Sequence, residues 1–202
     1  MSGTITLGNN LPKIEKNIKI TGPSLKNIDI SGNDEYQIFD IGVSAIVEIS
    51  NLNLNDASMN GEEDENCSAA IYNAGNLTIT NVKFSNNHTN GSGGAIQSNT
   101  GSTLVVNNST FISNTATSMA GAIYAYDCTT TINNCIFDGN LSDTQGGAIL
   151  ADKGNITITS STFRNNNSIG GGSDIFILDG AILTNNSNTF DKNGGAGEIY
   201  TN

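Results

Sequence analysis

The stretch GGAILADKGNITITSSTFRNN, residues 146–166, contains both sequence elements that decide the fold. It opens with Gly-Gly-Ala-Ile and closes with Phe-x-x-Asn, and between them Ile156 and Ile158 alternate with threonines. A period of two is typical of a β-strand whose alternate side chains face one core. The stretch therefore predicts short strands separated by glycine corners.

Both elements recur along the chain with nearly constant spacing. The Phe-x-x-Asn copies begin at intervals of 27, 26, 26 and 27 residues, at Phe84, Phe111, Phe137, Phe163 and Phe190. The intact or altered Gly-Gly-Ala-Ile copies end at Ile71, Ile96, Ile123, Ile149, Ile175 and Ile199. This repeat, without any helical period, predicts an all-β fold: a right-handed, single-stranded parallel β-helix, a solenoid of about seven coils with three short strands each.

Stacked coils about 4.8 Å apart place equivalent residues above one another. The phenylalanines are therefore expected to form an internal stack, and Cys135 is expected to be a small core residue in a column with Val82, Ser109 and Ser161. A second ladder is expected from Asn87, Asn114, Asn140, Asn166 and Asn193. We expect these asparagines to occupy a buried turn, because Asn tolerates the left-handed conformation and its amide can bond to the backbone or to the next Asn.

One domain is expected over residues 1–202. In the looser part, residues 1–60, the pairs Ile5 and Leu7, Ile18 and Ile20, and Ile28 and Ile30 are expected to mark the three strands of the first coil. Residues 61–66 are predicted to be an acidic insertion loop, for which calcium binding stays open, and residues 67–202 the regular repeats. Because the first residues lack a signal-peptide pattern, we expect a segment of a longer protein.

Paired Gly-Gly-Ala-Ile and Phe-x-x-Asn elements resemble the repeat of the chlamydial polymorphic outer membrane proteins, and of adhesin-like surface proteins of other microbes. The paired elements cover residues 68–199. The resemblance implies a surface-exposed β-helical passenger, often exported by an autotransporter route, with adhesion as its usual role. It thereby implies a location at the cell surface or outer membrane, or secretion, and attachment to a host, a cell-surface protein or a glycan.

The net charge of −11 argues against nucleic acid as a partner, since a phosphate backbone would be repelled. Uncapped coils expose strand edges, so end-to-end self-association is expected as well.

An enzyme is the second hypothesis, because β-helices also host polysaccharide lyases and hydrolases. Hydrolases need paired carboxylates, and lyases need a basic residue beside acidic calcium ligands. Arg164 is the only arginine, while Asp127, Asp152 and Lys153 lie near one column. We interpret these residues as solvated surface charges. The sequence therefore predicts no catalytic residue, no metal site and no cofactor.

The residues that follow the ladder isoleucines are predicted to face outward and to form the partner-binding surface: Tyr72, Gln97, Tyr124, Leu150, Phe176 and Tyr200. The opposite register would bury Gln97 and Asp174, which is costly without hydrogen-bond partners. Shielding of this stripe by loops is the alternative interpretation. A lesser hypothesis is ice binding by outward Thr78, Thr131, Thr157 and Thr184, an array that Val105 interrupts.

Overall fold

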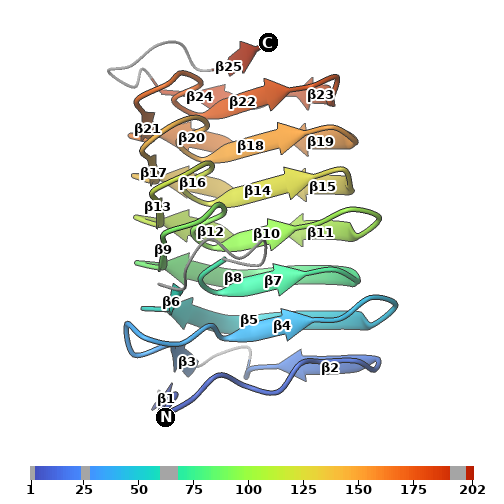
Figure 1. Cartoon of the computed structure of the whole chain (residues 1–202), viewed down its shortest axis with the longest axis vertical. Helices are drawn as coiled ribbons and strands as arrows, with labels where there is room; N and C mark the ends of the chain where they lie inside the picture. Colours follow the sequence, from blue (N-terminus) through green and yellow to red (C-terminus); the bar gives the residue numbers. More distant parts are fainter. Residues whose placement is uncertain (1–2, 24–27, 60–67, 192–198) are drawn as a thin grey trace.

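The computed structural model describes residues 3–23, 28–59, 68–191 and 199–202, and these form a stack of parallel β-coils (Figure 1). The described residues contain strands, turns and bends but no helix. Three sheets of 13, seven and five strands run along the stack. Between residues 39 and 168, each of five successive coils contributes to all three sheets before the chain rises to the next coil.

The 13-stranded sheet is bent and has two columns of strands. The first column contains β2 (Ile18–Thr21), β5 (Ile46–Asn55), β8 (Asn76–Ser85), β11 (Thr103–Asn107), β15 (Thr129–Asn133), β19 (Asn155–Thr159) and β23 (Ile182–Asn186). The second column contains β1 (Gly3–Thr6), β3 (Ile28–Ser31), β12 (Thr110–Ile112), β16 (Ile136–Asp138), β20 (Thr162–Arg164) and β24 (Thr189–Phe190), and the ends of β5 and β8 also belong to it.

The other two sheets complete each coil. The seven-stranded sheet contains β4 (Phe39–Ile41), β7 (Ile71–Asn73), β10 (Ile96–Ser98), β14 (Ile123–Tyr126), β18 (Ile149–Asp152), β22 (Ile175–Leu178) and β25 (Ile199–Thr201). The five-stranded sheet contains β6 (Ser58–Met59), β9 (His88–Thr89), β13 (Thr115–Ala116), β17 (Leu141–Ser142) and β21 (Asn167–Ser168).

The register places equivalent repeat residues beside one another. Ile71, Ile96, Ile123, Ile149, Ile175 and Ile199 are paired in succession across the seven-stranded sheet. The chain is therefore a solenoid of about seven coils of about 26 residues, and the predicted fold class is confirmed.

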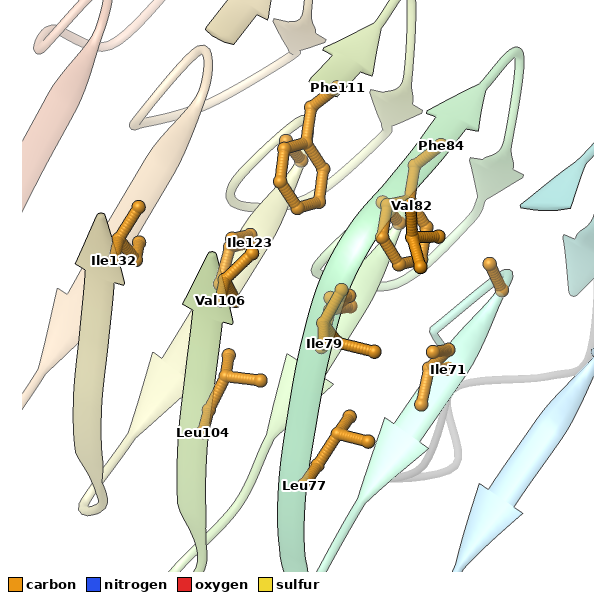
Figure 2. Close-up of a cluster of buried hydrophobic side chains, with 14 of the residues drawn as sticks. Ile71, Leu77, Ile79, Val82, Phe84, Leu104, Val106, Phe111, Ile123 and Ile132 are labelled. Carbon is orange, nitrogen blue, oxygen red and sulfur yellow. The ribbon is translucent and has the colours of Figure 1, made fainter. Parts of the chain in front are cut away.

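The predicted aromatic stack lies in the interior. Rings of successive coils lie 4.7–5.0 Å apart and nearly parallel, from Phe84 through Phe111, Phe137 and Phe163 to Phe190. Figure 2 shows Phe84 projecting into the same interior as Leu77 and Ile79 of its own strand, β8, and as Leu104 and Phe111 of the next coil. One cluster of buried apolar residues extends along the stack, so the coils share a single core. Cys135 is buried in it, as predicted.

The asparagine ladder also forms, although its backbone differs from the prediction. Asn87, Asn114, Asn140 and Asn166 are buried, and their amides bond from coil to coil. The left-handed residue is the one before each ladder asparagine, namely Asn86, Ser113, Gly139 and Asn165. The preceding residue turns the chain, which leaves the asparagine free to direct its amide inward. Asn193 lies outside the described residues.

The first coils are built differently from the prediction. Ile5 in β1 pairs with Ile30 in β3, so these two strands occupy the same column in successive coils. The three apolar pairs of the N-terminal region therefore belong to more than one coil, and the prediction of one starting coil was wrong. Alternation identified each strand, but only pairing assigns a strand to a column. The acidic segment 61–66 lies outside the described residues.

Candidate functional site

The outer face of the seven-stranded sheet has two columns of side chains, because alternate residues of each strand point away from the core. The first outer column is the predicted partner-binding stripe: Tyr72, Gln97, Tyr124, Leu150, Phe176 and Tyr200. Its inward neighbours, the ladder isoleucines, lie in the main core. Tyr124, Leu150 and Phe176 instead form a separate apolar cluster, which confirms the predicted register.

The first outer column is nevertheless buried. Leu150 is 0% exposed and Phe176 1%, and Tyr72, Gln97 and Tyr124 are buried as well. Only Tyr200, whose ring stacks on Phe176 at 4.8 Å, is exposed, at 44%. The prediction of an open surface was therefore wrong for the first five residues. Ala120 also belongs to the apolar cluster of this column, and the half-buried Met119 packs against it.

The glycine corners explain this burial. Gly146 and Gly172 adopt φ of +69° and +61°, and a Cβ on either would lie about 3 Å from the Cβ of Leu150 or Phe176. The segment before each isoleucine thus folds back over the side chain that follows it. These segments also bond to one another: Gly93 N–H donates to the oxygen of Met119, Ala120 N–H to that of Gln145, and Gly146 N–H to that of Gly171. The segments at the glycine corners therefore cover the first outer column, in agreement with the alternative interpretation that loops shield it.

Several polar groups of the first outer column and its neighbours have hydrogen-bond partners. Asn99 Nδ2 donates a hydrogen bond to the hydroxyl of Tyr72 at 2.8 Å, and Gln97 Nε2 donates to Asn99 Oδ1 at 3.3 Å. Asp174 is fully buried, and its Oδ1 accepts a bond from Asn166 Nδ2 at 2.8 Å. The expectation that the predicted register leaves Gln97 and Asp174 unburied was therefore wrong. Gln97 is covered on the outer face, and hydrogen bonds offset the burial of both side chains.

A second outer column lies two residues further along the same strands, and the residues predicted from the sequence did not include it. Tyr126, Asp152 and Leu178 are paired in this order on β14, β18 and β22, and Asn99 follows β10 at the equivalent position. Asn99, Tyr126 and Leu178 are half-buried, so this column reaches the surface beside the covering loops. The sequence signal for this column was the same period of two, continued to the second residue after each member of the first column.

Asp152 is the unusual member of the second outer column. It is 8% exposed, so its interpretation as a solvated surface charge was wrong, and its buried Oδ1 has no hydrogen-bond partner among the described residues. Burial raises the pKa of this carboxyl above its ordinary value. Lys153 opposes that shift, while Asp179 and Asp127 add to it. Burial of a carboxyl group without its full set of hydrogen bonds is costly to the folded state.

Lys153 is held against the aromatic member of the column. Its Nζ lies 3.4 Å from the hydroxyl of Tyr126 and 5.1 Å from the centre of that ring. The Tyr126 ring in turn lies 6.1 Å from that of Tyr124 in a stacked arrangement. Lysine and the buried tyrosine therefore hold Tyr126 in place.

The remaining polar candidates have structural roles. Arg164 Nε is paired with Asp138 Oδ2 at 3.0 Å on neighbouring coils, and Nδ1 of the lone histidine, His88, lies 2.8 Å from the hydroxyl of Thr115. Burial raises the pKa of the Cys135 thiol to about 11. Within the described ranges, no cluster of three or more His, Cys, Asp or Glu side chains is placed to hold a metal ion, and no helix is long and apolar enough to span a membrane.

Comparison with known protein families shows to which family the chain belongs. A family model described as "Right handed beta helix region" matches residues 18–202. No curated protein and no solved structure matches the chain.

Proposed function

Because this chain belongs to the right-handed beta helix region family, whose fold presents long outer faces, we propose that it is a non-catalytic β-helical module that attaches to cells or glycans. One observation carries the proposal. The interior of the coils repeats, whereas the second outer column changes from an amide to a phenol, a carboxylate and an aliphatic chain at Asn99, Tyr126, Asp152 and Leu178. The repeated fold does not require the side chains of this column to differ, whereas recognition of a particular partner does.

The resemblance to the chlamydial polymorphic outer membrane protein repeat supports a more specific proposal. Each Gly-Gly-Ala-Ile element supplies a corner, a covering loop and a core isoleucine, while each Phe-x-x-Asn element supplies the ring stack and the amide ladder. We place the chain among adhesin-like passengers of this type, at the cell surface or secreted. A cell-surface protein or a glycan is then its partner.

An adhesion assay tests the proposal. Beads that carry the purified chain should retain cells or immobilised glycans in flow, and beads that carry a β-helical enzyme of similar size and charge should not. Asn99→Ala combined with Tyr126→Ala should reduce retention, and Thr131→Ala on the 13-stranded sheet should not. Equal retention by the unmodified chain and by both of its variants would remove the second outer column from the proposal. No retention by the unmodified chain would overturn adhesion.

A polysaccharide-degrading enzyme is the alternative, and Asp152 is the observation that favours it. A buried carboxyl with a raised pKa beside Lys153 has the character of a general acid. Incubation with a panel of polysaccharides should then release reducing or unsaturated ends, and Asp152→Asn should abolish the release. The ice-binding alternative rests on the paired column of Thr78, Val105, Thr131, Thr157 and Thr184, and thermal hysteresis would test it.

A further inference from the structure

Three members of the asparagine ladder begin the tripeptide Asn-x-Ser/Thr, which is the acceptor sequence for asparagine-linked glycans. The tripeptides are Asn87-His88-Thr89, Asn140-Leu141-Ser142 and Asn166-Asn167-Ser168. Acceptor asparagines ordinarily lie at the surface, because the attached oligosaccharide is large and hydrated. These three asparagines are instead 0–1% exposed. The chain therefore carries glycan acceptor sequences at positions that its fold buries.

The atom that would carry the glycan is fully engaged in the folded chain. Asn140 Nδ2 donates one hydrogen bond to the backbone oxygen of Phe111 at 3.1 Å and one to Asn166 Oδ1 at 2.9 Å. The Nδ2 atoms of Asn87 and Asn166 also donate two hydrogen bonds each, one to a backbone oxygen and one to a side-chain oxygen. Both N–H groups of each amide are therefore used inside the stack.

Attachment of a glycan replaces one of these N–H groups. The amide nitrogen displaces a lipid pyrophosphate from C1 of an oligosaccharide, so that a C–N bond forms, the C–O bond to the pyrophosphate breaks and one amide proton is released. The modified side chain loses a hydrogen bond at a buried position, which is costly. An oligosaccharide also has no room in a close-packed interior that continues from coil to coil. A ladder asparagine therefore either carries a glycan or takes its place in the fold.

The hydroxyl group that completes the tripeptide has a structural role of its own. Ser142 Oγ donates a hydrogen bond to the backbone oxygen of Gln145 at 2.9 Å, and Ser168 Oγ donates to that of Gly171 at 2.6 Å. The ladder and these bonds account for the tripeptides without any glycan. Ala116 is paired with Ser142 at the equivalent position of β13, so the fold does not require the hydroxyl group there.

We infer that this chain acquires its fold out of reach of any oligosaccharyltransferase. Such an enzyme acts on an extended and accessible segment, so it reaches the ladder asparagines only before the coils stack. A chain modified at that stage cannot close its ladder. Export to the proposed location at the cell surface then follows a route on which no asparagine-linked glycan is added before folding. The inference is independent of whether the chain attaches to cells or glycans.

Secretion from yeast tests the inference, because an added signal peptide leads the unfolded chain past such a transferase. Two variants accompany the parent chain. The ladder variant lacks the three buried acceptor tripeptides and combines Thr89→Ala, Ser142→Ala and Ser168→Ala. The control variant lacks the tripeptides of three exposed asparagines, Asn76, Asn108 and Asn155, and combines Thr78→Ala, Thr110→Ala and Thr157→Ala.

Peptide mapping and protease digestion distinguish the three chains. The parent chain and the control variant should carry glycans on ladder asparagines and should be retained in the cell in a protease-sensitive form. The ladder variant should be secreted in a protease-resistant form, with glycans at exposed asparagines only. Production of each variant in the bacterial cytoplasm, followed by thermal melts, establishes that its substitutions allow folding. Retention of a ladder variant that folds in bacteria would overturn the inference.

Inhibition of lipid-linked oligosaccharide synthesis extends the test to the parent chain without any substitution. The inhibitor should restore secretion of folded parent chain. Secretion of folded parent chain in the absence of the inhibitor would overturn the inference, whether its ladder asparagines are glycosylated or bare. Retention that persists with the inhibitor would also overturn it, because a glycan would then not be what prevents folding.

Discussion

Asn114 Nδ2 donates a hydrogen bond to Asn140 Oδ1 over 2.9 Å, and the same oxygen accepts the backbone N–H of Asn114 at 3.1 Å. Asn140 in turn donates to the carbonyl oxygen of Phe111 and to Asn166 Oδ1. One side chain therefore joins three coils at a point that water does not reach. At the far end of the described ladder, Asp174 accepts the bond from Asn166 and stands where most coils carry alanine before the isoleucine.

Replacement of Asn140 by alanine should destabilise the stack. The change leaves the backbone N–H and the amide of Asn114 without their acceptor in a buried position, and each unsatisfied buried group costs about 1–3 kcal/mol. Urea unfolding followed by circular dichroism measures the loss. Asn133→Ala is the matched control, because its amide bonds Asn107 on the partly solvated outer face, and a change within about 0.5 kcal/mol is expected there. Equal losses for both variants would contradict the structural role of the inner ladder.

Phe137→Ala should be the most damaging of the single changes considered. Its ring is fully buried and stacks between Phe111 at 4.7 Å and Phe163 at 4.8 Å, so truncation leaves a cavity that the rigid neighbouring coils cannot fill. Such truncations cost about 3–5 kcal/mol. Thr131→Ser on the outer face should stay within about 0.5 kcal/mol. Thermal melts that rank these two variants in the opposite order would show that the assignment of inner and outer faces is wrong.

The sequence predicted the interior well because repetition and alternation both report on it. Equal spacing fixes which residues share a column, and a period of two fixes which of them face the core. The stack of Phe137 and its neighbours and the isoleucine ladder follow directly from these two facts. The amide bonds of Asn140 follow too, since a column of identical buried amides can satisfy itself.

Spacing and alternation could not predict the outside of the coil. Alternation states that Leu150 points away from the core, but it does not state what lies above it. Burial of Leu150 depends on the path of Gly146, whose left-handed conformation returns the chain across the sheet. The left-handed turn residues were missed for a related reason, because Ser113 and Gly139 share a conformation without sharing a side chain.

Gly121→Ala should destabilise the chain strongly. A Cβ at this position would lie 2.3 Å from the backbone oxygen of Gly147 and 2.5 Å from the backbone nitrogen of Leu141, so two stacked segments would have to separate. Overpacking of this kind costs about 1–3 kcal/mol or more. Gly8→Ala, where a Cβ meets nothing within 4 Å, should be nearly neutral. Chemical denaturation of the two variants measures the difference, and similar midpoints would refute the close approach.

End-to-end association is expected of the purified 202-residue chain. Within the described ranges, β23, β24 and β25 at one end and β1 and β2 at the other each pair on one side only. Open edges of parallel strands accept further strands, here those of a second copy. Sedimentation velocity over a range of concentrations should therefore reveal assemblies longer than one copy. A single monomeric species at the highest concentration reached would rule this out.

Asp152→Asn should stabilise the protein at neutral pH. Burial raises the pKa of the Asp152 carboxyl, so the folded state favours its neutral form. The stability linked to this group is therefore fully present below the ordinary aspartate pKa, about 3.9, and is lost as the pH rises through the raised value. The amide does not titrate and avoids that loss.

Thermal melts from about pH 3 to about pH 7 should show a higher melting temperature for the variant at neutral pH and a gap that closes toward the acidic end. Asp138→Asn is the control, because Asp138 is paired with Arg164 and its replacement should not stabilise the chain. A gap independent of pH would mean that the buried charge of Asp152 carries no penalty in stability.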